Sequence, residues 1–198
     1  CDMLSLSGAL EAAQQGLIIP VLVGPRARIE AVATEAGRDL GDTEIVDVPH
    51  SHAAARTAVA LVRAGKVEAV MKGKLHTDEL MAAIVDRVDG IRTERRMSHV
   101  YALDVPNYPK SLFITDAAIN IYPTLDEKRD IVQDAIDLAR ALGIAVPKVA
   151  LLSAVETVSP KITSTVEAAA LCKMADRGQI SGGIVDGPLA FDNAISKS

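Results

Sequence analysis

"IIPVLVGPRARIEAVATEAGRDLGDTEIVDVP", residues 18–49, decides the fold class of this chain. Its two ends, residues 18–24 and 43–49, are short apolar runs rich in β-branched residues, and each stops at Gly or Pro. Runs of this kind are typical of strands buried on both faces of a sheet. Residues 27–37 between them have the Ala-rich helical spacing that follows the first strand of a βαβ unit. The sequence therefore predicts an α/β protein with a parallel sheet.

The same alternation continues and then changes after Gly90. A helix is predicted over 52–65 and a third strand over 67–73. Two further strands, 98–106 and 110–118, are separated only by "NYP". So short a connection predicts an antiparallel hairpin, because parallel strands need a longer crossover.

Residues 124–143 form the clearest helix in the chain. Thr124 and Glu127 have the spacing of a capping box, and Gly143 suits the end of the helix. Its apolar stripe is expected at four positions: Ile131, Ala135, Leu138 and Leu142.

A second helix is predicted over 164–178, with Ser164 and Glu167 as another capping box and Gly178 at its end. Strands are predicted on either side of it, over 147–155 and 182–188.

The polar segment "VDGIRTERRMSH" separates two α/β parts. We therefore predict two domains, 1–93 with a phosphate-side loop and 94–198 as a second α/β domain that is incomplete. Because the chain starts at Cys1 rather than Met, we expect it to be a segment of a longer protein.

Composition excludes several classes of protein. The net charge of −5 argues against general affinity for nucleic acid, which requires a basic face. Cys1 and Cys172 lack the spacing of a metal site or a disulfide framework, which favours a reducing cytoplasm and no bound metal. No apolar run reaches about 18 residues, so no membrane span is predicted.

The first candidate site is "MKGKLHTDEL", residues 71–80, a strand end followed by a glycine turn and a helix start. Free amides at a helix start bind anions, lysines add positive charge, and Thr77 suits the N-cap. The alternative is an ordinary turn with solvated lysines. The substrate-binding candidates here are Lys72, Gly73, Lys74, His76 and Thr77.

Two further candidates follow. Arg92, Arg95 and Arg96 can grip phosphate as guanidinium forks, with Ser98 beginning the next strand. The alternative is a solvated loop, or pairing of these arginines with Glu94 and Asp89. Asp116 and Asn120 either face a crevice or tie down their own loop through Asx hydrogen bonds.

The segment 184–196 offers a weaker candidate. Asp186, Gly187 and Asp192 can reach a cleft, or Asp186 can cap a following turn. The spacing of the two acids matches no metal motif.

Six segments occur together in the order and spacing of the phosphate acetyltransferase and phosphate butyryltransferase family, which this chain resembles. They are "MKGKLHTDEL", "RTERRMSHV", "ITDAAIN", "PKVALLSAVETVSPK", "EAAALCKMADRGQI" and "IVDGPLAFDNAIS". The resemblance is strong from Met71 to Ser198 and weaker before Met71. "LHTDEL" and "TERRMSH" are most similar to the acetyltransferase domain found behind an enoyl-CoA hydratase-like domain.

The resemblance implies reversible transfer of an acetyl group between coenzyme A and inorganic phosphate, with phosphate butyryltransferase as the alternative. It implies two α/β/α domains flanking a cleft, as in isocitrate and isopropylmalate dehydrogenases, and a homodimer. Coenzyme A, phosphate and acyl phosphate are then substrates, and no cofactor is tightly bound. Two other classes stay open, a non-catalytic domain that binds coenzyme A or acyl phosphate, and a dehydrogenase of the same fold.

The resemblance also bears on catalysis. The family's Ser-Arg pair and following acid are expected after Ser198, so no catalytic residue is assigned in this sequence. Met81 stands where related members carry an arginine, and either an arginine of residues 92–96 replaces it or phosphate is held differently.

Overall fold

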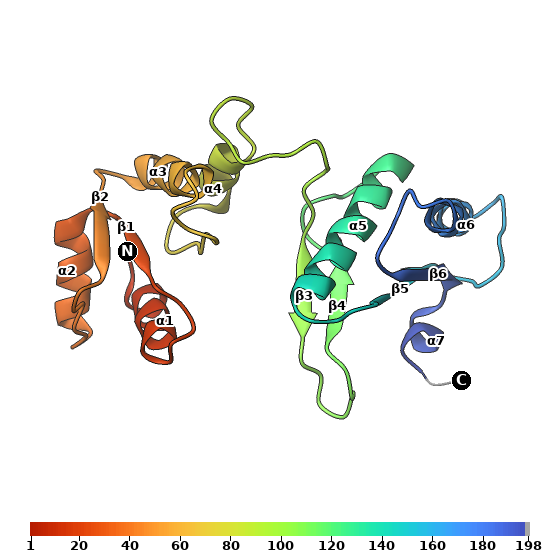
Figure 1. Ribbon diagram of the computed structural model, residues 1–198, viewed down its shortest axis with the longest axis horizontal. Helices are drawn as coiled ribbons and strands as arrows, with labels where there is room; N and C mark the ends of the chain where they lie inside the picture. The colour runs from red at the N-terminus through yellow and green to blue at the C-terminus, as the bar shows by residue number, and fades with distance from the viewer. Residues whose placement is uncertain (197–198) are drawn as a thin grey trace. The chain divides into compact units, whose positions relative to one another are not determined.

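The computed structural model describes residues 1–196, and the chain divides into two compact units, Cys1–Arg92 and Thr93–Ser198 (Figure 1). The first unit contains α1 (Met3–Gln14), β1 (Val21–Gly24), α2 (Arg26–Glu35), β2 (Glu44–Asp47), α3 (Ser51–Arg63) and α4 (Thr77–Ile84). The second contains β3 (Val100–Leu103), β4 (Leu112–Thr115), α5 (Leu125–Ala141), β5 (Lys148–Leu152), α6 (Thr163–Asp176), β6 (Ile184–Leu189) and α7 (Phe191–Ile195). The predicted mixed α/β class is confirmed. α1 and α7 were not predicted.

The βαβ unit predicted in the first forty-nine residues is present. β1 and β2 pair in parallel, with Val21 opposite Glu44 and Gly24 opposite Asp47, and α2 connects them. The Arg26 amide at the start of α2 donates to Asp47 Oδ1 at 2.8 Å, so the neighbouring strand caps this helix. The core of the unit is formed by Leu6, Leu10, Ile29 and Ala33.

The strand predicted over 67–73 is wrong. This segment is irregular, and Met71 within it is 66% exposed. A strand is stabilised by ladder hydrogen bonds to a neighbour, and within residues 1–196 β1 and β2 pair only with each other in this unit. Apolar composition therefore did not suffice to form a strand here.

The second unit holds two small sheets. β3 and β4 form the predicted antiparallel hairpin, with Val100 opposite Thr115. β5 and β6 pair in parallel, and their register shifts between Ala150 and Leu152. Gly187 allows the close approach at this shift, because a Cβ there would lie 2.7 Å from the Cβ of Leu151.

α5 begins as predicted but buries a different face. Its capping box is complete, since Glu127 N donates to Thr124 Oγ1 and Thr124 N donates to Glu127 Oε2. The predicted stripe is wrong at its end, where Leu138 is 38% and Leu142 60% exposed. The buried apolar face is formed instead by Ile131, Val132, Ala135, Ile136 and Ala139. Packing of Val132 and Ile136 against α6 selects this face.

The capping box predicted for α6 is also wrong. Its N-cap is Ile162, with no side-chain cap, because both predicted partners are bonded elsewhere. Ser164 Oγ lies 2.8 Å from Ser153 Oγ, and Glu167 pairs with Lys128. Gly178, in the left-handed region at φ 74°, ends the helix as expected.

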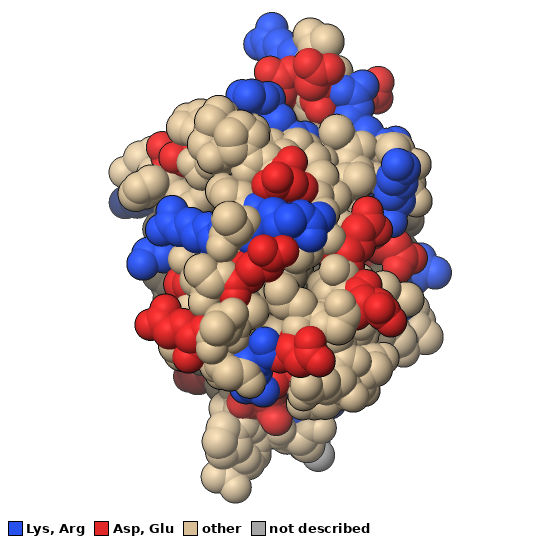
Figure 2. Space-filling model, turned by 90° about the vertical axis from the view of Figure 1, so that its left-hand side faces the viewer, with Lys and Arg blue, Asp and Glu red and all other residues tan. Residues whose placement is uncertain are grey.

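Surface charge is mixed. On the face shown in Figure 2, Lys and Arg side chains are interspersed with Asp and Glu side chains. Within residues 1–196, no helix combines the length and apolar character needed to cross a membrane.

Candidate functional site

The loop Lys72–Thr77 in the first unit is held by its own lysine. Lys72 Nζ donates to the carbonyl oxygens of Gly73 at 3.3 Å and Leu75 at 3.0 Å. Leu75 N also donates to Gly73 O at 3.0 Å, which closes a tight turn. Lys72 therefore shapes the loop, whereas Lys74, His76 and Thr77 are exposed around it.

α4 starts without a side-chain cap. Its N-cap is His76, so Thr77 is the first helical residue and the prediction of Thr77 as N-cap is wrong. His76 makes no capping hydrogen bond, and helix geometry leaves the first amides without an intrahelical acceptor. The exposed Lys74 ammonium, Thr77 hydroxyl and these amides are the donor types that hold phosphate.

Gly73 is not required by the packing of the chain itself. A Cβ at this position would lie 3.7 Å from the Cβ of Ser5, an ordinary contact. The prediction of Gly73 as a substrate-binding residue therefore stays a prediction.

Glu79, in the first turn of α4, has an unusual carboxylate. Its Oε2 is buried without a hydrogen-bond partner among the described residues, and its Oε1 lies 3.8 Å from His52 Nδ1. His50 caps α3 by accepting from the Ala53 amide at 3.2 Å.

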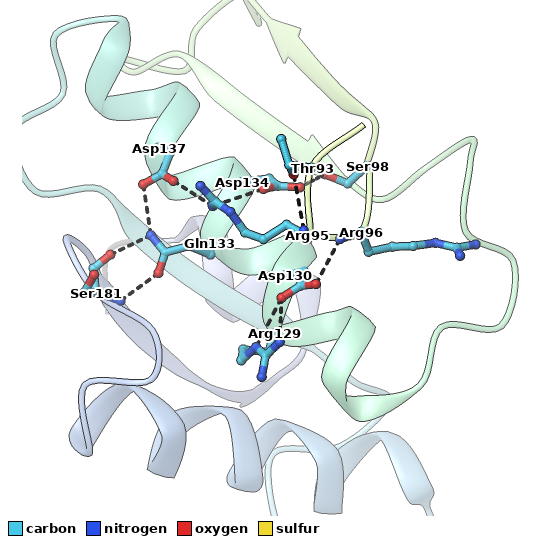
Figure 3. Close-up of polar contacts among 10 residues, drawn as sticks. All are labelled: Thr93, Arg95, Arg96, Ser98, Arg129, Asp130, Gln133, Asp134, Asp137 and Ser181. Carbon is cyan, nitrogen blue, oxygen red and sulfur yellow. Dashed lines mark hydrogen bonds and ion pairs between the residues drawn. The ribbon is translucent and has the colours of Figure 1, made fainter. Parts of the chain in front are cut away.

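The arginines of the second unit meet acids on α5, as Figure 3 shows. Arg95 donates to Asp134 Oδ1 at 3.2 Å and to Asp137 Oδ2 at 2.8 Å. Ser98 Oγ donates to the other oxygen of Asp134 at 2.9 Å. Two carboxylates thus neutralise Arg95, a predicted phosphate ligand, and Ser98 is engaged with one of them.

Arg96 is held by three polar contacts. Its backbone amide donates to Asp130 Oδ2 at 2.9 Å, and its Nε donates to Asn120 Oδ1 at 2.7 Å. Its guanidinium also pairs with Glu127 at 3.3 Å. The predicted pairing of these arginines with Glu94 and Asp89 is therefore wrong, because Arg95 and Arg96 pair with acids on α5 and Asp89 pairs with Arg63. Arg92 is exposed.

Burial and hydrogen bonding shift the pKa values of Asp130 and Asp134 in opposite directions. Burial raises the pKa of Asp134, against the hydrogen bond from Ser98 and the charge of Arg95. Burial also acts to raise the pKa of Asp130, but hydrogen bonds from the Arg96 amide and Arg129 outweigh it and lower this pKa.

Asp116 and Asn120 tie down their own loop. Asp116 Oδ1 accepts from the amides of Ala118 and Ile119, both at 3.0 Å. Asn120 Nδ2 donates to Asp116 and to the carbonyl oxygen of Met97, which occupies both of its hydrogens. Asp116 and Asn120 therefore follow the predicted alternative in which they tie down their own loop through hydrogen bonds.

The acidic candidates near the C-terminus make no side-chain hydrogen bond beyond their own segment within residues 1–196. Asp186 Oδ1 accepts from the Gly187 amide at 2.9 Å, and both residues lie within β6, so the expectation that Asp186 caps a turn is wrong. Asp192 lies in the first turn of α7. Cys172 Sγ donates to Gly187 O at 3.4 Å, and burial raises the pKa of this thiol. Within residues 1–196, no group of three or more His, Cys, Asp and Glu side chains is arranged to hold a metal ion.

The acids of α5 were missed as partners by the sequence reasoning. Asp130, Asp134 and Asp137 recur at helical spacing on one face of the helix predicted over 124–143. The sequence signal for these ion pairs was this acidic helix face together with the cluster of arginines at 92–96.

Comparison with known proteins gives a consistent result. The family described as phosphate acetyl/butaryl transferase matches residues 51–198. A phosphate acetyltransferase from Rhizobium meliloti is 64% identical over 197 residues, which cover 100% of this chain and 62% of that protein. A phosphate butyryltransferase from Clostridium acetobutylicum is 44% identical over 192 residues, covering 97% of this chain and 64% of the relative.

A solved structure is also similar. The crystal structure of a branched-chain phosphotransacylase from Enterococcus faecalis V583 superimposes with a TM-score of 0.70 at 27% identity, over 88% of this chain and 70% of the other. The chain spans less than two thirds of the length of the two curated relatives above.

Proposed function

The chain belongs to the phosphate acetyl/butaryl transferase family, and we propose that its protein transfers an acetyl group reversibly between coenzyme A and inorganic phosphate. The observation that carries this proposal is the Lys72–Thr77 loop, with exposed donors before an uncapped helix start. Identity of 64% to a phosphate acetyltransferase supports the choice of acetyl.

The reaction explains why such a loop is needed. In one direction the coenzyme A thiolate attacks the carbonyl carbon of acetyl phosphate, forming the C–S bond, and the C–O bond to phosphate breaks. The thiol proton passes to a base, and phosphate leaves as an anion. Donors at Lys74, Thr77 and the first amides of α4 would hold the phosphate and stabilise its charge as it leaves.

The proposed function implies further features of the whole protein. We assign residues 1–93 and 94–198 to two α/β/α domains flanking a cleft, as in isocitrate and isopropylmalate dehydrogenases. The second would carry the interface of a homodimer, and the protein would be cytoplasmic with coenzyme A as a substrate and no tightly bound cofactor. The similarity to a solved phosphotransacylase supports the domain assignment.

A butyryl substrate is the second candidate, supported by the 44% identity to a phosphate butyryltransferase. Acetyl-CoA and butyryl-CoA are compared in the same assay, with phosphate present. A higher kcat/KM for acetyl-CoA is expected, and the opposite order assigns the protein to the butyryl branch.

The experiment that tests the function is release of free thiol from acetyl-CoA by the full-length protein. Release should require phosphate and yield acetyl phosphate in equal amount. Binding of coenzyme A without phosphate-dependent release would instead support the non-catalytic class.

A further inference from the structure

The chain passes from one compact unit to the other between Arg92 and Thr93. The residues before this point are held to the first unit. Asp86 Oδ1 accepts from the amides of Val88 and Asp89, and Ile91 N donates to Ile84 O at 2.9 Å. Gly90 packs so closely that a Cβ would lie 2.4 Å from the carbonyl oxygen of Asp86. The first unit is thus ordered up to Ile91.

The residues after the crossing are held to α5 by carboxylates (Figure 3). Asp130 accepts from the backbone amide of Arg96, so it fixes the main chain itself. Asp134 accepts from both Arg95 and Ser98. The side chains of Asp130 and Asp134 are 12% and 27% exposed, so solvent screens these contacts less than those of a surface pair.

Polar contacts also connect α5 and Arg96 to two other segments of the unit. Asp137 accepts from Gln133 at 2.9 Å, and Gln133 exchanges two hydrogen bonds with the backbone of Ser181 before β6. Arg96, fixed by Asp130, donates to Asn120 in the loop after β4.

Between the two anchors lie only Arg92, Thr93 and Glu94, all exposed. Among the described residues, the one side-chain hydrogen bond there is from the Arg95 amide to Thr93 Oγ1 at 3.2 Å. Hinges are typically a few loop residues that absorb the backbone change between rigid parts.

We propose that Asp130 and Asp134 are positioning residues, which fasten residues 95–98 to α5 and confine the hinge between the units to Arg92–Glu94. They act through Arg96 and Ser98, and none of the four is assigned to the reacting atoms. Any effect on turnover rests on the proposed acyl transfer, whereas the fastening itself does not.

Residue-resolved amide hydrogen exchange of the full-length protein tests the proposal. The Arg96 amide should exchange at least roughly tenfold more slowly than the amides of Thr93 and Glu94, because opening it requires loss of the Asp130 hydrogen bond. Asp130→Ala should remove that difference. Asp130→Asn keeps an acceptor oxygen and should retain most of the difference in exchange rate. If the negative charge of Asp130 alone slowed the exchange, Asp130→Asn would lose the difference as Asp130→Ala does.

Asp126→Ala is the matched control, since Asp126 lies on the same helix, is 82% exposed and pairs only weakly with Arg129 at 3.7 Å. This variant should leave the exchange rate of the Arg96 amide unchanged. The amide of Ile184, bonded to Pro147 O in the same unit, reports general loosening. Asp134→Ala serves as a second variant if Asp130→Ala does not fold, and should speed exchange across residues 95–98.

Equal exchange of Arg96 and Thr93 in the unmodified protein overturns the proposal. So does an Asp130→Ala effect that extends equally to Ile184, because it would be general destabilisation. Failure of the unmodified protein to release coenzyme A would overturn the proposed function and leave the exchange result standing.

Discussion

Replacing Thr77 by Val removes a hydroxyl from the start of α4 while keeping the shape of the side chain. Thr77 is exposed and is not the N-cap, so its hydroxyl does not cap the helix. A hydrogen bond to a charged group contributes about 1.5–3 kcal/mol, and 1.4 kcal/mol corresponds to about tenfold in affinity. Thr77→Val should therefore raise the KM for phosphate by roughly ten- to a hundredfold.

Lys74→Ala tests the charge at the same loop. Because Lys74 is exposed, solvent screening limits its contribution to about 1 kcal/mol, or roughly a fivefold rise in the phosphate KM. The KM for acetyl-CoA should change less in both variants. Lys66→Ala, which removes an exposed lysine after α3, is the matched control and should leave both constants unchanged.

The assay is initial-rate release of thiol from acetyl-CoA at varied phosphate concentration, with far-ultraviolet circular dichroism to confirm folding. If Thr77→Val and Lys74→Ala both keep the phosphate KM of the unmodified protein, phosphate does not bind at this loop. A rise confined to the acetyl-CoA KM would place the coenzyme there instead.

Three further predictions concern stability. Ile136 is fully buried, so Ile136→Ala should lower the free energy of unfolding in urea by about 2–5 kcal/mol, and a loss below about 1 kcal/mol would contradict the packing described. Gly187→Ala places a Cβ 2.7 Å from Leu151 and should cost about 1–3 kcal/mol or more, seen as a lower Tm; an unchanged Tm would show that β5 and β6 can separate freely. The lowered pKa of Asp130 means that its ionised form stabilises the fold, so this stability is present above the usual value of 3.8 and is lost as pH falls through the lowered pKa. The free energy of unfolding should therefore decrease less in Asp130→Asn than in the unmodified protein as pH falls from about 5 into the acid range. Urea titration at each pH measures this, and an unaltered pH dependence would refute the stabilising role of ionised Asp130.

Much of the secondary structure could be predicted because its signals are local. The strand–helix–strand unit at 18–49, the hairpin around "NYP" and the capping box at Thr124 each depend on residues a few positions apart. The errors arose where a distant partner intervened. Ser164 bonds to Ser153 instead of capping α6, and the strand expected at 67–73 has no neighbour within the described chain.

The candidate loop at Lys72–Thr77 could also be predicted, since its donors are consecutive in the chain. The roles within it could not, because only the backbone conformation makes His76 the N-cap and turns Lys72 back onto two carbonyl oxygens.

By itself the sequence determined the α/β class, the helix α5 with its capping box and a family resemblance carried by ordered motifs. Only the tertiary structure decided which arginines are already neutralised. Arg95 meets Asp134 and Asp137, thirty-nine and forty-two residues further along the chain. A hydrogen bond requires the two atoms to meet within about 3 Å, and for residues so far apart in sequence the packing of α5 alone determines that distance.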